Sequence, residues 1–274
     1  RELLKKWTFY IIPQMNPDAA KNNKAWMDWP FSLRIYLQNK IEKSPGDDLE
    51  FGFPESNDDT NIRPENKAAV EFLSREDNFH IHFSLHNFDL GGGILFLINN
   101  NGGRNSFQLQ AKLKGITNKL GFSMYDIDRK GEKGMVRLSA GFSTTPDSSA
   151  MKKYLLEQNQ PVLADNIKLS SFEFIEKRGG NPLVIVSEIP FFISPFLVSV
   201  KTEAEQQLEL FLQTELQQCS VELKAGQDHL YNDVVKRFSI SPISIKDQIR
   251  IQFRMILCAL AEVKSKEFNN FINF

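Results

Sequence analysis

The chain has 274 residues, of which 41% are hydrophobic and 24% charged, the composition of an ordinary globular protein that can bury a core. A net charge of −1 gives no overall basic field, which excludes nucleic-acid binding driven by global charge alone. The two cysteines, Cys219 and Cys258, are too few for a disulfide scaffold or a cysteine-rich zinc site. We therefore expect a protein of a reducing compartment, the cytoplasm.

The N-terminal part of the chain combines two apolar runs with a strongly acidic segment. Strands are predicted over residues 7–12 and 31–37. The segment 44–65 is rich in Pro, Gly, Asn and acidic residues, which predicts a solvated acidic loop. A short helix is predicted over 64–74, because Pro64 is well suited to the first turn of a helix.

The middle of the chain predicts a series of strands separated by turn material. Two of the connections, Asn99–Gly103 and Asp128–Gly131, are hairpin signals. Because the connections leave no room for crossover helices, we expect an antiparallel sheet. The predicted strands cover residues 79–86, 93–99, 106–113, 121–127 and 135–142.

One helix and further strands are predicted between residues 147 and 200. Asp147 is expected to cap a helix over 148–157. Strands follow at 166–175, with a bulge near Ser170, and then at 183–189 and 196–200. The run 182–200 is the most apolar of the chain, but Glu188 and three prolines argue against a transmembrane segment.

After residue 201 the apolar spacing becomes helical. Helices are predicted from Thr202, around 228–238, and from Ser244, where an apolar stripe begins at Ile249 and Phe253. The predicted fold is α+β, with a mostly antiparallel twisted β-sheet and helices packed at the C-terminal end. Residues 1–200 would form the β-rich domain with its acidic loop near 44–65, and residues 201–274 a helical segment, either separate or part of the same domain.

Three of the four histidines, His80, His82 and His86, fall within seven residues of one predicted strand. Because side chains alternate along a strand, the three imidazoles and Ser84 share one face, and the apolar residues between them share the other. Two imidazoles at this spacing can converge on one metal ion. A polar, solvent-facing surface is the alternative reading.

The string His80-x-His82, followed by His86 and Gly93, is similar to the first metal motif of the cupins. The resemblance covers about fifteen residues. It implies that His80, His82 and His86 bind a transition metal.

A second constellation begins with an acid on the helix over 64–74. Asp89 follows a strand, and Gln110-x-Lys112 lies on a later predicted strand, where Gln110 and Lys112 share a face. This order resembles the core of the PD-(D/E)xK nucleases. The resemblance implies that Asp89 binds Mg²⁺, Gln110 takes the weak third position and Lys112 stabilises developing charge, with nucleic acid as the substrate.

No set of catalytic residues is complete in the sequence, so we expect a soluble binding or assembly protein. Its apolar C-terminal helix, within 244–274, would bind a protein partner or a second copy, or else pack on its own sheet. The alternatives are the nuclease and the metal site on the His80/His82 face. Mg²⁺ or a transition metal is expected as a cofactor only in those two cases.

Overall fold

A computed structural model of the chain describes residues 3–27, 31–41, 49–56, 58–99, 106–126, 132–194, 241–244 and 246–256. Several predicted features lie outside these ranges. They are the strand at 196–200, the helices from Thr202 and around 228–238, both cysteines, and the apolar stripe beyond residue 256.

Helices and strands alternate along the described chain. The helices are η1 (Leu3–Lys5), α1 (Pro17–Asn22), α2 (Lys24–Met27), α3 (Leu33–Asn39), α4 (Pro64–Leu73), α5 (Ser106–Lys119), η2 (Glu132–Gly134), α6 (Ser148–Glu157), α7 (Pro161–Asn166), α8 (Ser171–Lys177) and a helical segment over 246–256. The strands are β1 (Ile81–Gly91), β2 (Leu95–Ile98), β3 (Arg137–Ser139), β4 (Phe142–Thr144), β5 (Leu183–Ile193) and β6 (Ser241–Pro242). Within these ranges no helix has the length and apolar content that crossing a membrane requires.

The strands form one mixed sheet in the order β1-β5-β2-β4-β3, with β6 paired to β5. β1 is parallel to β5 and β2 is parallel to β4, whereas the pairs β2–β5 and β3–β4 are antiparallel. The fold does combine helices with a sheet, but the prediction of a mostly antiparallel sheet is wrong.

The connection from β1 to β2 shows why short connections misled the prediction. β1 and β2 are only three residues apart in sequence, yet β5 lies between them in the sheet. Stepping over one strand requires about 10 Å, a distance that four extended residues span. The glycines in this connection allow a close approach, because a Cβ atom on Gly93 would lie 2.1 Å from the carbonyl oxygen of Ser123.

Three predicted strands are wholly or partly helical. The segment predicted as a strand over 106–113 belongs to α5, which supplies the crossover between the parallel strands β2 and β4. Its buried residues Leu109 and Leu113 are four apart, a spacing that fits both an alternating strand and a helix. The segments 31–37 and 166–175 likewise contain α3 and the start of α8. Ser170 is the N-cap of α8 in a capping box rather than the site of a bulge.

Other sequence predictions are confirmed. The helices α4 and α6 form where expected, and the Asp147 carboxylate accepts the Ala150 N–H at 2.7 Å as the cap of α6. β1, β2 and β5 also form, and β5 continues through Pro190 to Ile193. Residues 7–12 form no strand, and within 121–126 only Met124 makes a bridge, to Ile94.

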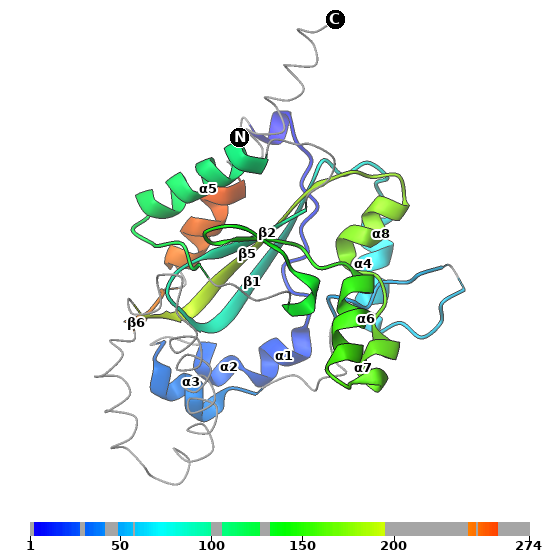
Figure 1. Ribbon diagram of the computed structural model, residues 1–274, viewed down its shortest axis with the longest axis horizontal. Coiled ribbons are helices and arrows are strands. Elements are labelled where there is room, and N and C mark those ends of the chain that lie inside the picture. The colour runs from blue at the N-terminus through cyan, green and yellow to red at the C-terminus, as the bar shows by residue number, and fades with distance from the viewer. Residues whose placement is uncertain are drawn as a thin grey trace, which may run out of the picture.

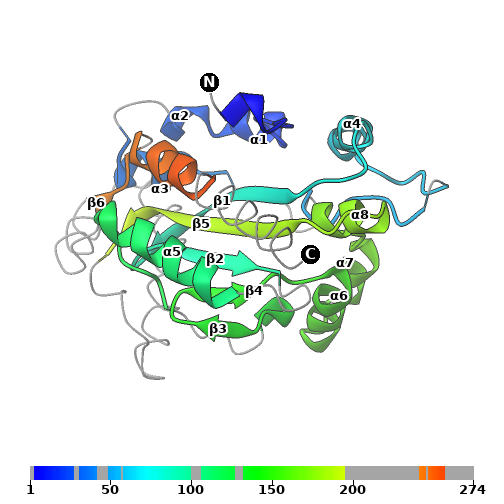
Figure 2. The same cartoon turned by 90° about the horizontal axis from the view of Figure 1, so that it is seen from above.

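Helices cover both faces of the sheet (Figure 1). On one face, α5 and the helix over 246–256 bury apolar side chains, among them Ile251 and Met255, against the strands. On the other face, α2 and α3 bury Trp26 and Tyr36. Figure 2 shows α5 lying across the sheet, and Figure 1 shows α4, α6, α7 and α8 together at one end of it.

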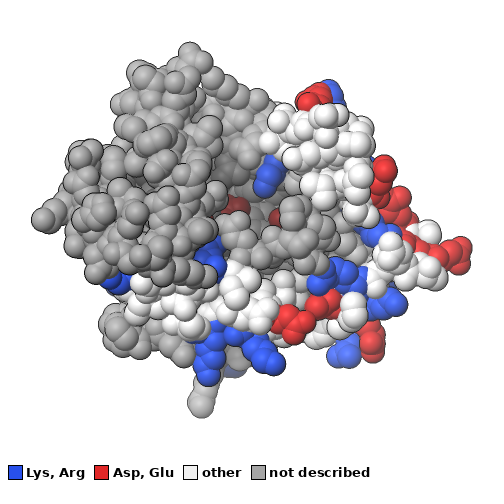
Figure 3. Space-filling view, turned by 90° about the horizontal axis from the view of Figure 1, so that it is seen from below, with Lys and Arg blue, Asp and Glu red and all other residues white. Residues whose placement is uncertain are grey.

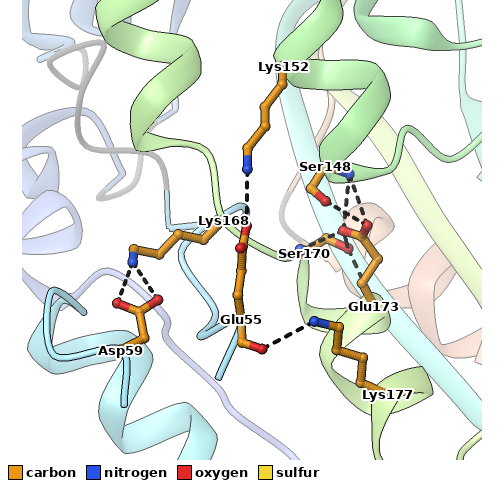
Figure 4. A network of polar contacts seen from close by, with 8 residues as sticks. All are labelled: Glu55, Asp59, Ser148, Lys152, Lys168, Ser170, Glu173 and Lys177. Atoms are coloured by element: carbon orange, nitrogen blue, oxygen red, sulfur yellow. Dashed lines mark hydrogen bonds and ion pairs between the residues drawn. The ribbon is translucent and has the colours of Figure 1, made fainter. Parts of the chain in front are cut away.

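Part of the predicted acidic loop is anchored to this group of helices by lysines (Figure 4). The Glu55 carboxylate accepts from Lys152 at 3.0 Å, and Asp59 accepts from Lys168 at 2.5 and 2.6 Å. The hydrogen bond and charge of Lys168 hold the pKa of Asp59 below its usual range. Phe53 adds a backbone bridge to Leu169, so the described part of the loop packs on the fold.

Candidate functional site

The candidate site lies on β1. His82, Ser84 and His86 alternate along this strand with Ile81 and Phe83, which pack against the core on the α5 side. The three polar side chains therefore share the opposite face of the sheet, as the sequence predicts. The same face carries the aromatic cluster of α2 and α3 further along β1, so this polar group borders an apolar core.

His86 has a hydroxyl and two carboxylates close to its ring. Its Nε2 atom lies 2.7 Å from Ser84 Oγ, a hydrogen-bond distance. Its Nδ1 atom lies 3.9 Å from Glu188 Oε1, and its Nε2 atom lies 3.6 Å from Glu50 Oε1. One imidazole is thus placed between a serine on one side and a glutamate on the other.

The register of the sheet places Glu188 beside His86. The two residues are direct partners in the parallel pair of β1 and β5, so their side chains leave the sheet on the same face. Glu188 is the only charged residue of β5, whose other side chains are mostly buried and apolar. The carboxylate is therefore held by a strand that is fixed in the core.

Glu50 reaches the site from the acidic segment that precedes α4. Its neighbours Leu49 and Phe51 are buried, and the carbonyl oxygen of Phe51 accepts the backbone N–H of Lys168 at 2.8 Å. These contacts hold the backbone on both sides of Glu50, so its position near His86 does not depend on the ion pair alone.

His86 and Glu188 are recessed but remain open to solvent. The side chain of Glu188 is 14% exposed and that of His86 is 29% exposed. Figure 3, seen from the side of α1–α3, shows acidic atoms set back near the centre of this face of the molecule. A small polar molecule could thus reach the imidazole, while Coulomb interactions there are stronger than at the open surface.

His82 lies four residues before His86 but has different surroundings. Its Nε2 atom lies 3.0 Å from the hydroxyl of Ser171, the first residue of α8. Burial lowers the pKa of His82 to about 4, and the charge of His86 adds to the effect. His82 is therefore neutral at pH 7, and it acts as a half-buried hydrogen-bonding partner of Ser171.

The arrangement around His86 can support proton transfer to and from a nucleophile. With its proton on Nδ1, facing Glu188, the ring can accept the Ser84 hydroxyl proton at Nε2. A serine, a histidine and a carboxylate in this order activate serine nucleophiles on unrelated folds. The distance of 3.9 Å is longer than a hydrogen bond, and such contacts are often loose in a protein without substrate.

The three residues predicted for a nuclease do not come together. Asp89 lies on β1, where it accepts from Tyr36 Oη and, at 2.5 Å, from Lys40 Nζ, both on or next to α3. Gln110 lies in α5 and accepts from Ser139 of β3 at 2.5 Å. Since β1 and β3 are the two edges of the strand order, about 19 Å of sheet separates these positions.

The predicted face shared by Gln110 and Lys112 is absent because α5 is a helix. Residues two apart in a helix differ by about 200° around its axis. Gln110 is accordingly buried, whereas Lys112 is exposed. The prediction that both residues share one strand face is wrong. The arrangement of side chains that the nuclease resemblance requires is therefore not present.

The three histidines predicted as metal ligands also have separate surroundings. His80 precedes β1, is exposed, and packs edge to face against Trp7 with ring centres 6.0 Å apart. His82 faces Ser171 and His86 faces Ser84. In the part of the chain that the structure describes, no group of three His, Cys, Asp or Glu residues is arranged to hold a metal ion.

Sequence reasoning found His86 and placed Ser84 beside it, but it missed Glu188 and Glu50. One signal was available, because Glu188 is a lone charge in the most apolar run of the chain and so required a polar partner inside the fold. The chain matches no model of a protein family, and comparisons with curated proteins and with solved structures give no match either.

Proposed function

We propose that the chain is a hydrolase that cleaves an ester or amide bond at His86. The observation that carries this proposal is one imidazole with a serine hydroxyl 2.7 Å from Nε2 and a glutamate carboxylate 3.9 Å from Nδ1. Ser84 Oγ attacks the carbonyl carbon while His86 Nε2 takes the hydroxyl proton and then gives it to the leaving group. Water hydrolyses the acyl-serine in a second step, with Nε2 again accepting the proton.

The charges around the site support a neutral or cationic substrate. Glu188 and Glu50 bring two negative charges to within 4 Å of the ring, against one positive charge when His86 is protonated. An anionic substrate would be repelled by both carboxylates, and most strongly by Glu188, which is only 14% exposed and therefore less screened by solvent than a surface charge. A neutral ester or an amide beside a cationic group fits the site better than a phosphodiester.

The proposal can be tested with p-nitrophenyl acetate as a reporter substrate and a fluorophosphonate as a covalent probe. We expect slow hydrolysis of the ester and modification of Ser84, located by peptide mass spectrometry. Both readouts should be lost in Ser84→Ala and in His86→Ala. The matched control is Ser171→Ala, which removes the hydroxyl beside the neighbouring histidine, His82, and should keep both readouts.

Two outcomes contradict the serine mechanism. One is modification of other serines with Ser84 unmodified in the folded protein. The other is hydrolysis that requires added ZnCl₂ or MgCl₂, is abolished by EDTA, and survives Ser84→Ala while His86→Ala removes it. The second outcome would support a metal at His86 in place of an activated serine.

A second candidate function is binding or assembly through the C-terminal region 244–274. It is supported by the helix over 246–256, where Ile251 and Met255 are buried in the core but Ile249 and Phe253 remain 63% and 58% exposed. A protein partner or a second copy would bury these two outward side chains. Phe253→Ser is then expected to weaken self-association, measured by sedimentation at increasing concentration.

We also place the protein in the cytoplasm as part of this proposal. Its two cysteines suit a reducing compartment, where thiols stay unpaired. Fractionation of cells that express the tagged full chain tests this location, and recovery with secreted or envelope fractions would contradict it.

A further inference from the structure

The outward surface of α5 and the helix over 246–256 has a charge unlike that of the rest of the chain. These two helices pack side by side on one face of the sheet and share a core (Figure 1). Six cationic side chains are exposed on them, and Asp247 is their one acidic residue. The six are Lys112, Lys114, Lys119, Lys246, Arg250 and Arg254.

This segregation is strong for a protein of low net charge. Six cations and one acid give the two-helix surface a charge of +5, whereas the whole chain carries −1, so the other residues sum to −6. Asp247 lies at the start of the second helix, where its carboxylate accepts from Ser244 Oγ at 2.7 Å, and its charge is already included in the sum of +5. The surface therefore presents a local positive field to an approaching partner.

Large apolar side chains stand among these cations. Phe107 on α5 is 77% exposed, and Ile249 and Phe253 on the second helix are also more than half exposed. Each helix buries a different stripe in the sheet, Leu109 and Leu113 in one case and Ile251 and Met255 in the other. The exposed apolar residues therefore lie outside the stripes that pack on the sheet.

We infer that this two-helix surface binds an anionic lipid membrane in its interfacial plane. Lysine is depleted in the buried centre of protein–protein interfaces, yet four of the six cations here are lysines interleaved with the apolar side chains. Nucleic acid would engage the cations but offers no apolar layer for Ile249 and Phe253. Cations that meet lipid phosphates, with aromatic and aliphatic side chains inserted between headgroups, use both parts of the surface.

This inference rests on the second candidate function, because it uses the same exposed residues, and it names a lipid surface in place of a protein partner. It is independent of the site at His86, which lies on the opposite face of the sheet. Membrane binding and hydrolysis can therefore fail separately.

The test is co-sedimentation of the full chain with vesicles of phosphatidylcholine alone and of phosphatidylcholine with phosphatidylserine. We expect binding only to the anionic vesicles, and weaker binding at high salt. Each cation near such a surface strengthens partitioning about fivefold, so Arg250→Gln with Arg254→Gln should lower it about 25-fold. Phe253→Ser should also lower it, because it removes the inserted ring.

The matched control removes two exposed lysines from other helices, Lys21→Gln on α1 and Lys153→Gln on α6. It changes net charge equally and should leave binding unchanged, and thermal unfolding monitors the fold of every variant. Equal binding to neutral vesicles, no binding to either, or equal losses in both double variants would overturn the inference. So would two specific patterns: self-association that Phe253→Ser abolishes without vesicle binding, and duplex DNA binding that the arginine variant weakens but Phe253→Ser does not.

Discussion

Two histidines on one face of β1, His82 and His86, each lie beside a serine hydroxyl but have different surroundings. His82 lies 3.0 Å from Ser171, and His86 lies 2.7 Å from Ser84. His82 is held neutral by burial, with its pKa near 4, whereas His86 has carboxylates within 4 Å of both ring nitrogens. Residue type and spacing therefore do not define a site here, because the strand paired with β1 supplies the carboxylate that distinguishes the two histidines.

The largest expected effect is the loss of esterase activity when Ser84 or His86 is replaced. Ser84→Ala and His86→Ala should each lower kcat/KM for p-nitrophenyl acetate by roughly 10²- to 10⁴-fold, or about 3–5 kcal/mol of transition-state stabilisation, because each removes the proton-transfer step. Steady-state rates of the purified variants measure this loss. A residual rate within a few-fold of wild type in both variants would place the chemistry elsewhere.

The second effect is the pH-dependent contribution of His82 to the stability of the fold. The pKa of His82 is about 4 in the folded chain and about 6.5 when unfolded, so the unfolded state binds the proton more tightly. The stabilising contribution of neutral His82 is complete above pH 6.5 and is lost as the pH falls through 4, a total of about 3 kcal/mol.

Urea unfolding of wild type and His82→Gln between pH 4 and pH 7 measures this contribution. We expect the free energy of unfolding of wild type to fall more steeply with decreasing pH than that of the variant. Parallel curves would mean that the pKa of His82 in the folded chain is not lowered.

The third effect distinguishes the two carboxylates beside His86. Glu188→Gln should lower kcat/KM roughly 10- to 100-fold, because a neutral amide facing Nδ1–H cannot stabilise the imidazolium that forms when Nε2 takes the Ser84 proton. Glu50→Gln should cost less than about threefold, since Glu50 lies near Nε2, the nitrogen that serves Ser84. A larger loss in Glu50→Gln than in Glu188→Gln would reverse the assigned roles.

The smallest effect concerns the hydroxyl of Ser171, which lies beside His82. Ser171→Ala removes the hydrogen bond to His82 and should lower the free energy of unfolding by about 1 kcal/mol, with kcat/KM unchanged. Thermal or urea unfolding, together with the ester assay, measures both quantities. A loss of activity without a loss of stability would show that the two pairs are coupled.

Much of the local structure could be predicted from the sequence, but the sheet topology could not. Asp147 caps α6 and Pro64 begins α4, because these signals lie within a few residues of the elements that they define. α5 was missed because Leu109 and Leu113 satisfy both strand and helix periodicity. That error removed the crossover helix, and the predicted sheet then became antiparallel.

Only the part of the candidate site that lies on β1 could be predicted from the sequence. Alternation along β1 places Ser84 and His86 on one face, and this is what the structure has. Glu188 is about a hundred residues away in sequence, and its approach to His86 depends on the pairing of β1 with β5, which no local pattern records. Asp89 and Gln110 show the reverse. Their order in the sequence resembles a nuclease core, but Asp89 lies on the edge strand β1, whereas Gln110 lies in α5 and contacts β3 at the other edge.

The most direct test of the account is a double-mutant cycle on Ser84 and His86 in the ester assay. If Ser84 and His86 act as one unit, the double alanine variant should be about as slow as either single variant, because removing one partner already stops the step. Losses that multiply in the double variant, or a Ser84→Ala variant as active as wild type, would contradict the proposed mechanism.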